Sequence, residues 1–142
     1  MPAQSGASTT LARMRRGYSR EAYDALVETA RAALPGVAFS TDIIVGFCGE
    51  TEAEHEATLD LLRKMKYSLG FLFAYSRRDK THAARRYADD VPEHVKQRRL
   101  QEALAVYSDG LAERRNELHG SRQLVCTSVD DCCDKGTATL AP

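Results

Sequence analysis

The sequence predicts an α/β fold built on parallel strands. Segments with helical spacing of apolar residues alternate with two short runs rich in β-branched or aromatic residues, in the order helix, strand, helix, strand, helix. The connection between the two runs is long enough for a crossover helix, which parallel strands require. The 142 residues, of which 43% are hydrophobic and 28% charged, suit one globular domain and exclude a wholly disordered chain.

The first helix is expected to begin after Ser19, a suitable N-cap residue, and to end before the helix-breaking pair Pro35-Gly36. Its apolar positions are Tyr23, Val27, Ala30 and Leu34. A strand is expected over residues 37–45, because the odd-numbered residues from Phe39 onward alternate as one apolar or β-branched face. The sequence therefore predicts a helix followed by a buried strand.

The second helix is expected to begin at a capping box formed by Thr51 and Glu54. Its acidic first turn suits the positive end of the helix dipole. The buried stripe is expected to consist of Thr58, Leu61, Leu62 and Met65. Residues 69–75 follow as the second apolar strand, so the two predicted strands and this helix form a parallel β/α unit.

The last helix is expected to begin, after a loop, at a second capping box over residues 90–93 that has Pro92 in its first turn. Its apolar stripe is expected to consist of Leu100, Leu104, Tyr107, Leu111 and Leu118. A glycine at position 110 interrupts this stripe, and the periodicity disappears after Gly120. The sequence therefore predicts a long final helix and a disordered tail over residues 126–142.

Only two complete strands are visible, together with the end of a third over residues 1–4. Parallel sheets usually have both faces covered, and two strands leave unpaired edges. The sequence therefore predicts part of a larger barrel or sheet.

The formal net charge of zero hides a strong segregation of charge. The first 20 residues contain four arginines and no acid, and residues 76–86 contain five cations against one acid. Such a segment can attract phosphates, and the alternative is a solvated basic loop. The longest charge-free apolar run, residues 69–75, is too short to cross a membrane, and no targeting segment is visible. No membrane partner is predicted.

The four cysteines and four histidines show no metal-binding spacing, so no metal site is predicted for this chain alone. Cys48 could be a nucleophile, but no histidine lies in a recognisable partner motif, and a structural thiol is the favoured interpretation. No catalytic residue is predicted.

Three segments are expected at the carboxyl ends of parallel strands, where ligands bind in such folds: residues 2–6, 46–51 and 75–78. Gly46 lets the backbone approach a ligand, and the alternative is a purely structural turn. Asp42 lies inside an apolar strand, where an unpaired charge is costly, so it either faces a ligand or pairs with an arginine.

An ordered set of segments resembles the second half of the radical S-adenosylmethionine methylthiotransferases of the MiaB type. The segments are Pro-Ala-Gln-Ser-Gly at 2–6, Met-Arg-Arg-Gly-Tyr-Ser at 14–19, Thr-Asp-Ile-Ile-Val-Gly-Phe-Cys-Gly-Glu-Thr at 41–51, Phe-Ala-Tyr-Ser at 73–76 and Asp-Asp-Val-Pro-Glu at 89–93. Bacterial members usually have proline where this chain has Cys48, which makes the chain more similar to animal mitochondrial members. The resemblance covers residues 1 to about 125.

The resemblance implies that residues 1–119 are the C-terminal half of a (β/α) radical S-adenosylmethionine barrel. It also implies that residues 120–142 are the truncated start of a TRAM domain with a divergent tail. Members of the family cleave S-adenosylmethionine reductively on a [4Fe–4S] cluster, with electrons from a donor protein. They insert sulfur at C2 of N6-isopentenyladenosine next to the anticodon in tRNA and methylate that sulfur. A mitochondrial location is implied, with the cytoplasm as the alternative.

The resemblance also implies site residues. Those expected around S-adenosylmethionine are Gln4, Ser5, Asp42, Ile44, Gly46, Ser76 and Arg77. Those expected towards the tRNA are Arg78, Lys80, Arg85 and Arg86. The cluster cysteines are expected upstream of Met1, so the chain alone is predicted to be inactive. The alternative function is a non-catalytic module that binds a protein partner through its C-terminal helix.

Overall fold

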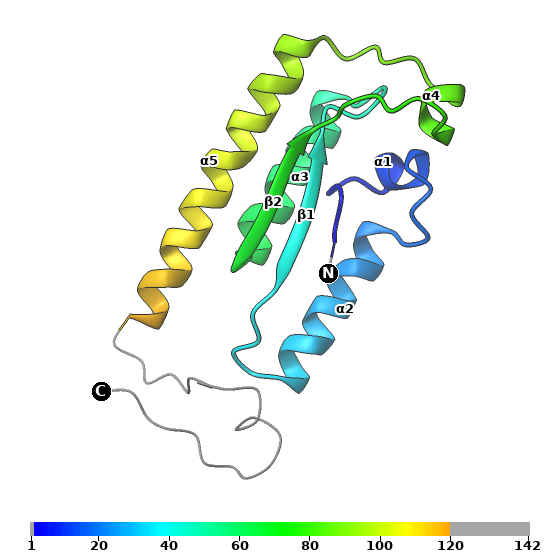
Figure 1. The fold of residues 1–142 in the computed structure, drawn as a ribbon. Helices are drawn as coiled ribbons and strands as arrows, with labels where there is room; N and C mark the ends of the chain where they lie inside the picture. The colour runs from blue at the N-terminus through cyan, green and yellow to red at the C-terminus, as the bar shows by residue number, and fades with distance from the viewer. Residues whose placement is uncertain (1, 120–142) are drawn as a thin grey trace, which may run out of the picture.

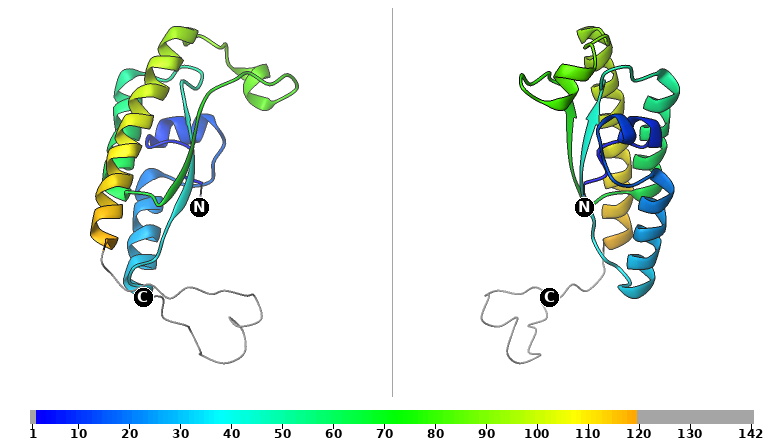
Figure 2. Two further views of the ribbon diagram at one scale, coloured as in Figure 1. Left: turned by 60° about the vertical axis from the view of Figure 1, so that its left-hand side comes forward. Right: turned by 90° about the vertical axis from the view of Figure 1, so that its right-hand side faces the viewer.

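The computed structural model describes residues 2–119. The elements in chain order are α1 (Ser8–Arg13), α2 (Arg20–Ala33), β1 (Ser40–Val45), α3 (Glu52–Met65), β2 (Leu69–Ala74), α4 (His82–Arg86) and α5 (Glu93–Leu118). The two strands lie at the centre of Figure 1, and α2, α3 and α5 lie on one side of them in the right-hand view of Figure 2. The predicted tail and TRAM segment lie outside the described residues.

The sheet is parallel, with β1 paired to β2 from Ser40 opposite Leu69 to Val45 opposite Ala74. The predicted end of a third strand is present as a single parallel bridge between Gln4 and Ile43. The α/β class and the parallel strands are therefore confirmed. A barrel is not, because the described residues contain only a two-stranded sheet and this bridge.

The core lies between the inner face of β1 and the helices α2 and α3. Ile43 and Val45 are completely buried, because alternate residues of a strand point to the same face. The core residues of the two helices are Tyr23, Val27, Leu59, Leu61, Leu62 and Met65. Tyr67 closes this core and shares a hydrogen bond of 2.9 Å with the hydroxyl of Tyr23. The predicted apolar positions of α3 are therefore confirmed.

Both predicted caps of these helices are also confirmed. The Ser19 side chain accepts the N–H of Ala22 at the start of α2. At the start of α3, Thr51 accepts the Glu54 N–H while the Glu54 carboxylate accepts the Thr51 N–H. This reciprocal pair satisfies two N–H groups that the helix leaves free.

The predicted capping box of the last helix is wrong. Helix α5 begins at Glu93, and its N-cap Pro92 offers no side-chain hydrogen bond. The Asp90 carboxylate instead accepts the Gly49 N–H at 2.7 Å, so it holds the turn after β1 rather than the helix. This long-range contact could not be read from the local pattern.

The predicted apolar stripe of α5 is only partly correct. Leu104 is 38% exposed, whereas Ala103 beside it is completely buried. Tyr107 contacts the sheet, and its hydroxyl accepts the Gly70 N–H at 2.9 Å. Tyr107 is therefore engaged within the fold, whereas Leu104 of the same helix remains exposed. The side chain of Leu118 lies outside the described residues.

Two short helices lie in segments for which no helix was predicted from the sequence. Helix α1 precedes α2, and α4 lies inside the cationic segment 76–86. No helix in the described part of the chain is both long and apolar enough to cross a membrane.

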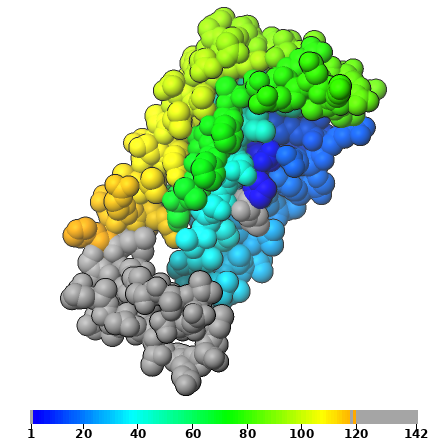
Figure 3. Space-filling model, viewed as in Figure 1, coloured from blue at the N-terminus to red at the C-terminus, as the bar shows by residue number. Residues whose placement is uncertain are grey.

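The outer face of the sheet is not covered by any helix of the described chain. Leu69, Phe71 and Phe73 of β2 are 51%, 51% and 54% exposed. In Figure 3 the atoms of β1 (cyan) and β2 (green) lie at the surface. One face of the sheet is therefore exposed in the described chain.

Candidate functional site

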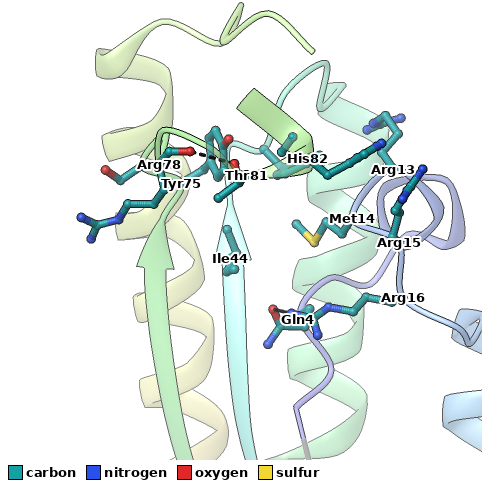
Figure 4. Close-up of a pocket in the computed structure, with 13 residues that line it drawn as sticks. Gln4, Arg13, Met14, Arg15, Arg16, Ile44, Tyr75, Arg78, Thr81 and His82 are labelled. Carbon is teal, nitrogen blue, oxygen red and sulfur yellow. Dashed lines mark hydrogen bonds between the residues drawn. The ribbon is translucent and has the colours of Figure 1, made fainter. Parts of the chain in front are cut away.

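A cavity of about 330 Å³ lies at the carboxyl ends of the strands. Its lining residues are Gln4, Arg13, Met14, Arg15, Arg16, Ile44, Phe47, Tyr75, Ser76, Arg78, Thr81, His82 and Ala83. They come from the N-terminal bridge strand, the turn after α1, the two strand ends and the start of α4 (Figure 4). Its position agrees with the rule for ligand sites in parallel α/β folds.

One wall of the cavity is apolar and aromatic. Phe47 follows β1 and Tyr75 follows β2, and their rings meet edge to face with centroids 4.9 Å apart. Ile44 adds an aliphatic side chain from β1. A cavity of this size with one apolar wall is typical of sites for small organic ligands.

The Tyr75 hydroxyl is a buried polar group of this wall. It has no hydrogen-bond partner of normal geometry among the described residues. Burial raises the pKa of Tyr75 to about 12, and the neighbouring Cys48 thiol adds to the rise. Cys48 is itself buried. A neutral hydroxyl with spare hydrogen-bonding capacity therefore lies beside the cavity.

Gln4 lies beside Ile44 of this wall in a left-handed backbone conformation, with φ of 63°. Its N–H donates to the Asp42 carbonyl, and its own carbonyl accepts the Ile44 N–H, both at 2.8 Å. The side-chain oxygen of Gln4 accepts a hydrogen bond of 2.8 Å from the Arg16 guanidinium. Gln4 is therefore fixed at its backbone and at its side chain.

Arg13 attaches α1 to α3. Its guanidinium donates two hydrogen bonds to the Glu54 carboxylate, at 2.9 and 2.8 Å. Burial opposes ionisation of Glu54, but the bonds from Arg13, the Thr9 hydroxyl and the Thr51 N–H lower its pKa to about 2. This bidentate pair fixes the turn that carries Met14, Arg15 and Arg16 to the cavity.

A group of cations surrounds the cavity without carboxylate partners. Within residues 2–119, no ion pair is formed by Arg15, Arg16, Arg77, Arg78, Lys80, Arg85 or Arg86. Burial and the charges of Arg15, Arg86 and Arg85 lower the pKa of His82. The cavity therefore has a positive rim.

The structure brings several of the predicted site residues together and places others elsewhere. Of the residues expected around S-adenosylmethionine, Gln4, Ile44 and Ser76 line the cavity, and so does Arg78 of the RNA set. Lys80, Arg85 and Arg86 belong to the same loop and helix but do not line the cavity.

The other four predicted residues lie outside the cavity lining. Ser5 is buried, and its hydroxyl lies 3.3 Å from that of Thr58 in α3. Gly46 packs against the side chain of Lys96. Arg77 donates to the Ala84 carbonyl at 2.9 Å. Asp42 forms no ion pair with any described residue, so the predicted alternative of an arginine partner is not realised in this part of the chain.

The sequence analysis did not predict the turn residues Met14, Arg15 and Arg16, which line the cavity although they are distant in sequence from the strand ends.

A buried pair that supports the turn after β1 was also not predicted. The Glu50 carboxylate accepts the Gly46 N–H at 2.7 Å and a bond of 2.9 Å from Arg99 of α5. Burial raises the pKa of Glu50, while the Gly46 N–H and Arg99 oppose that rise. A charge pattern along α5 could not identify this pair, because its partner lies 49 residues away.

Comparison with known proteins gives consistent matches. No protein-family model matches the chain. The mitochondrial tRNA methylthiotransferase CDK5RAP1 of Mus musculus is 50% identical over 99% of this chain, and the CDK5RAP1-like protein of Oryza sativa subsp. japonica is 54% identical over 88%. The tRNA-2-methylthio-N(6)-dimethylallyladenosine synthase of Chlorobium phaeobacteroides is 48% identical over 80%.

The chain spans only about a quarter of these relatives: 25%, 21% and 26% of their respective lengths. The match to the mouse protein extends past the limit near Val125 that the sequence analysis expected, since it includes 99% of the chain. The resemblance to the methylthiotransferases is therefore confirmed: over nearly its whole length, the chain is similar to one segment of the mitochondrial tRNA methylthiotransferases and of the bacterial synthases.

Proposed function

We propose that this chain is the part of a tRNA methylthiotransferase that forms one side of its S-adenosylmethionine site. The observation that carries the proposal is the identity of 50% to the mouse enzyme over 99% of the chain. The cavity at the strand ends supports it, because ligands of parallel α/β folds bind there.

In this proposal the whole enzyme converts N6-isopentenyladenosine next to the anticodon of mitochondrial tRNA into its 2-methylthio derivative. The names of the relatives, a mitochondrial tRNA methylthiotransferase and a tRNA-2-methylthio-N(6)-dimethylallyladenosine synthase, support the reaction and the location. Bound S-adenosylmethionine, with electrons delivered through a [4Fe–4S] cluster, would supply the radical chemistry and the methyl group.

The residues of the cavity fit an adenosyl ligand. Ile44, Phe47 and Tyr75 offer an apolar wall for a flat base, and the Tyr75 hydroxyl has spare hydrogen-bonding capacity. The Gln4 amide and the Ser76 hydroxyl would bind the polar groups of the ligand. Asp42 and Arg77 remain proposed contacts at the edge of this site.

Two of the proposed residues would position the segments that carry the ligand-binding residues. Ser5 is tied to Thr58 and holds the segment that carries Gln4, and Gly46 precedes Phe47 in the turn after β1. These two residues would therefore position the site rather than contact the ligand.

No cluster ligand is assigned to this chain. The described residues contain no group of three or more His, Cys, Asp or Glu side chains that could hold a metal ion. As the resemblance implies, we propose that other parts of the enzyme bind the cluster and that the chain by itself is inactive. Arg78, Lys80, Arg85 and Arg86 are proposed to face the tRNA, because cations without carboxylate partners favour phosphate.

A chimaera tests this proposal. The segment of the mouse enzyme that matches this chain is replaced by the chain, and the chimaera is expressed in cells that lack the enzyme. We expect 2-methylthio nucleosides to reappear in mitochondrial tRNA, measured by mass spectrometry of digested tRNA. The Q4A and S76A forms of the chimaera should reduce the product at least about tenfold, as expected when contacts of about 1.4 kcal/mol or more are lost.

The chain supplied alone is the matched control, and it should give no product. Product from the chain alone would contradict its predicted inactivity. A chimaera that is soluble and retains its iron but gives no product would contradict the proposed function.

A further inference from the structure

The cations of the cavity rim come from two walls that are far apart in the sequence. Arg78 follows β2, and Lys80 lies in the turn between Arg78 and Thr81. Arg15 belongs to the turn after α1, and Figure 4 shows it on the opposite side of the cavity from Arg78. Both arginines are exposed, and neither has a carboxylate partner among residues 2–119.

Elsewhere in the described chain, most cations have carboxylate partners, and Arg31, Arg114 and Arg115 are the exceptions. On the helical side of the fold, Arg20 is paired with Asp24 and Asp60, Arg98 and Arg99 are paired with Glu52, and Lys66 is paired with Glu113. Arg13, which is next but one to Arg15, is paired with Glu54. The rim therefore keeps a surplus of positive charge, whereas most cations elsewhere in the described chain are paired with carboxylates.

The backbone at the rim is strained as well. Four described residues other than glycine have positive φ, and three of them lie at or beside the cavity: Gln4 at 63°, Arg15 at 57° and Lys80 at 67°. The left-handed conformation is unfavourable for an L-residue, and residues in such strained conformations cluster at functional sites. Glycine would fit positions 15 and 80 without strain, but each position holds a cation instead.

We propose that Arg15 forms a second RNA-contacting wall opposite Arg78 and Lys80, so that a sugar–phosphate chain crosses the mouth of the cavity between the two walls. This inference rests on the proposed function, which predicts RNA contacts only on the segment from Arg78 to Arg86. Exposed cations spread over two walls match an extended polyanion better than one small ligand, which would be held by buried groups.

Because the backbone at position 15 is left-handed, glycine can replace Arg15 without added strain. The test therefore separates the loss of charge from a loss of stability. The R15G variant of the 142-residue chain removes the charge and also relieves the strain, so its melting temperature should stay equal to or rise above that of the unchanged chain. R15N, which also tolerates this backbone, is a second neutral variant, and R15K keeps the charge. Arg115, an exposed arginine of α5 without an ion pair among the described residues, gives the matched control R115A.

The measurement is the affinity for a labelled RNA stem-loop with a single-stranded loop, followed by fluorescence anisotropy over a range of salt concentrations. We expect R15G and R15N to weaken binding several-fold at low salt and to reduce the slope of log K against log salt by about 0.7, which corresponds to one lost phosphate contact. R15K and R115A should keep the slope of the unchanged chain.

The outcomes separate the two proposals. If R15G and R15N keep the full slope while R78A and K80G lose part of it, the second wall is wrong and the proposed RNA contacts stand. If the unchanged chain binds the RNA without salt dependence, or does not bind it, both are wrong. If R15G also lowers the melting temperature, Arg15 stabilises the fold, and the second wall is likewise contradicted.

Discussion

Gly46, directly after β1, packs closely against Lys96 of α5. Its φ of 73° is left-handed, and a Cβ at this position would lie 2.6 Å from Cγ of Lys96. The Lys96 side chain is buried there, with its ammonium group 2.6 Å from the Asp89 carboxylate and 5.5 Å from the centre of the Tyr75 ring. The absence of a side chain at Gly46 therefore allows the helix to hold the turn that leads to the cavity.

The G46A substitution should destabilise this turn for two reasons. The left-handed backbone costs an L-residue about 1 kcal/mol, and the contact with Lys96 adds about 1–3 kcal/mol of overpacking. The matched control is G36A, where φ is 81° and a Cβ would meet nothing within 4 Å. Opening free energies of the β1 amides, measured by hydrogen exchange, should fall more in G46A than in G36A. Equal losses would show that the close approach contributes nothing.

Helix α5 is attached to the rest of the fold by charged side chains as well as by apolar contacts. Arg99 is 4% exposed and binds both the Glu50 carboxylate and the Glu50 carbonyl, at 2.9 and 3.0 Å. Arg98 beside it also binds Glu52, but its side chain is 47% exposed. Because solvent screens exposed pairs, only the buried arginine should contribute strongly to the docking of α5.

The R99A substitution should therefore cost about 3–5 kcal/mol, since it leaves the Glu50 carboxylate buried without its guanidinium. R98A is the matched control and should have a much smaller effect. Hydrogen exchange of the α5 amides measures both variants under the same conditions. Similar exchange rates in R98A and R99A would contradict the assignment of Arg99 as the anchor of this helix.

At the scale of the whole molecule, α2, α3 and α5 lie on one side of the sheet, and no described helix covers its other face. The open face carries Leu69, Phe71 and Phe73, each more than half exposed, beside Asp42 and Ile44 of β1. A contiguous exposed apolar patch on a soluble protein marks an interaction surface or causes aggregation. The chain by itself should therefore bind hydrophobic dyes and associate.

The double substitution F71T/F73T should reduce both properties, because threonine keeps the β-propensity of the strand and removes the aromatic surface. Leu26 and Leu34, which are 54% and 61% exposed on or just after α2, give the matched control L26Q/L34Q. Dye fluorescence and light scattering should fall by at least about half in the strand variant. A larger fall in the helix variant would show that the sheet face is not responsible.

Much of the fold could be predicted from local sequence. The caps of α2 and α3, the buried positions of α3 and the parallel strands follow from short-range periodicity, because these elements bury one continuous face. The start of α5 could not be predicted in this way. Asp90 has the spacing of a capping residue, but its carboxylate accepts the Gly49 N–H instead.

The candidate site was only partly predictable for the same reason. The carboxyl-end rule selected the segments of Gln4 and Ser76, which line one cavity, since strand ends of a parallel sheet meet at one edge; Ile44 of the same cavity was expected only from the family resemblance. The rule did not identify Arg15, whose turn reaches the cavity only because Arg13 binds Glu54 across 41 residues. Nor did it show that Ser5 and Gly46 pack against Thr58 and Lys96.

The sequence by itself determined the order of the three long helices and two strands, the segregation of charge and the similarity to the methylthiotransferases, because all three depend only on the order of residues along the chain. Only the tertiary structure decided which charges are neutralised and which remain on the cavity rim. An ion pair depends on distances between side chains of different elements, and those distances exist only after α1, α3 and α5 have packed against the sheet.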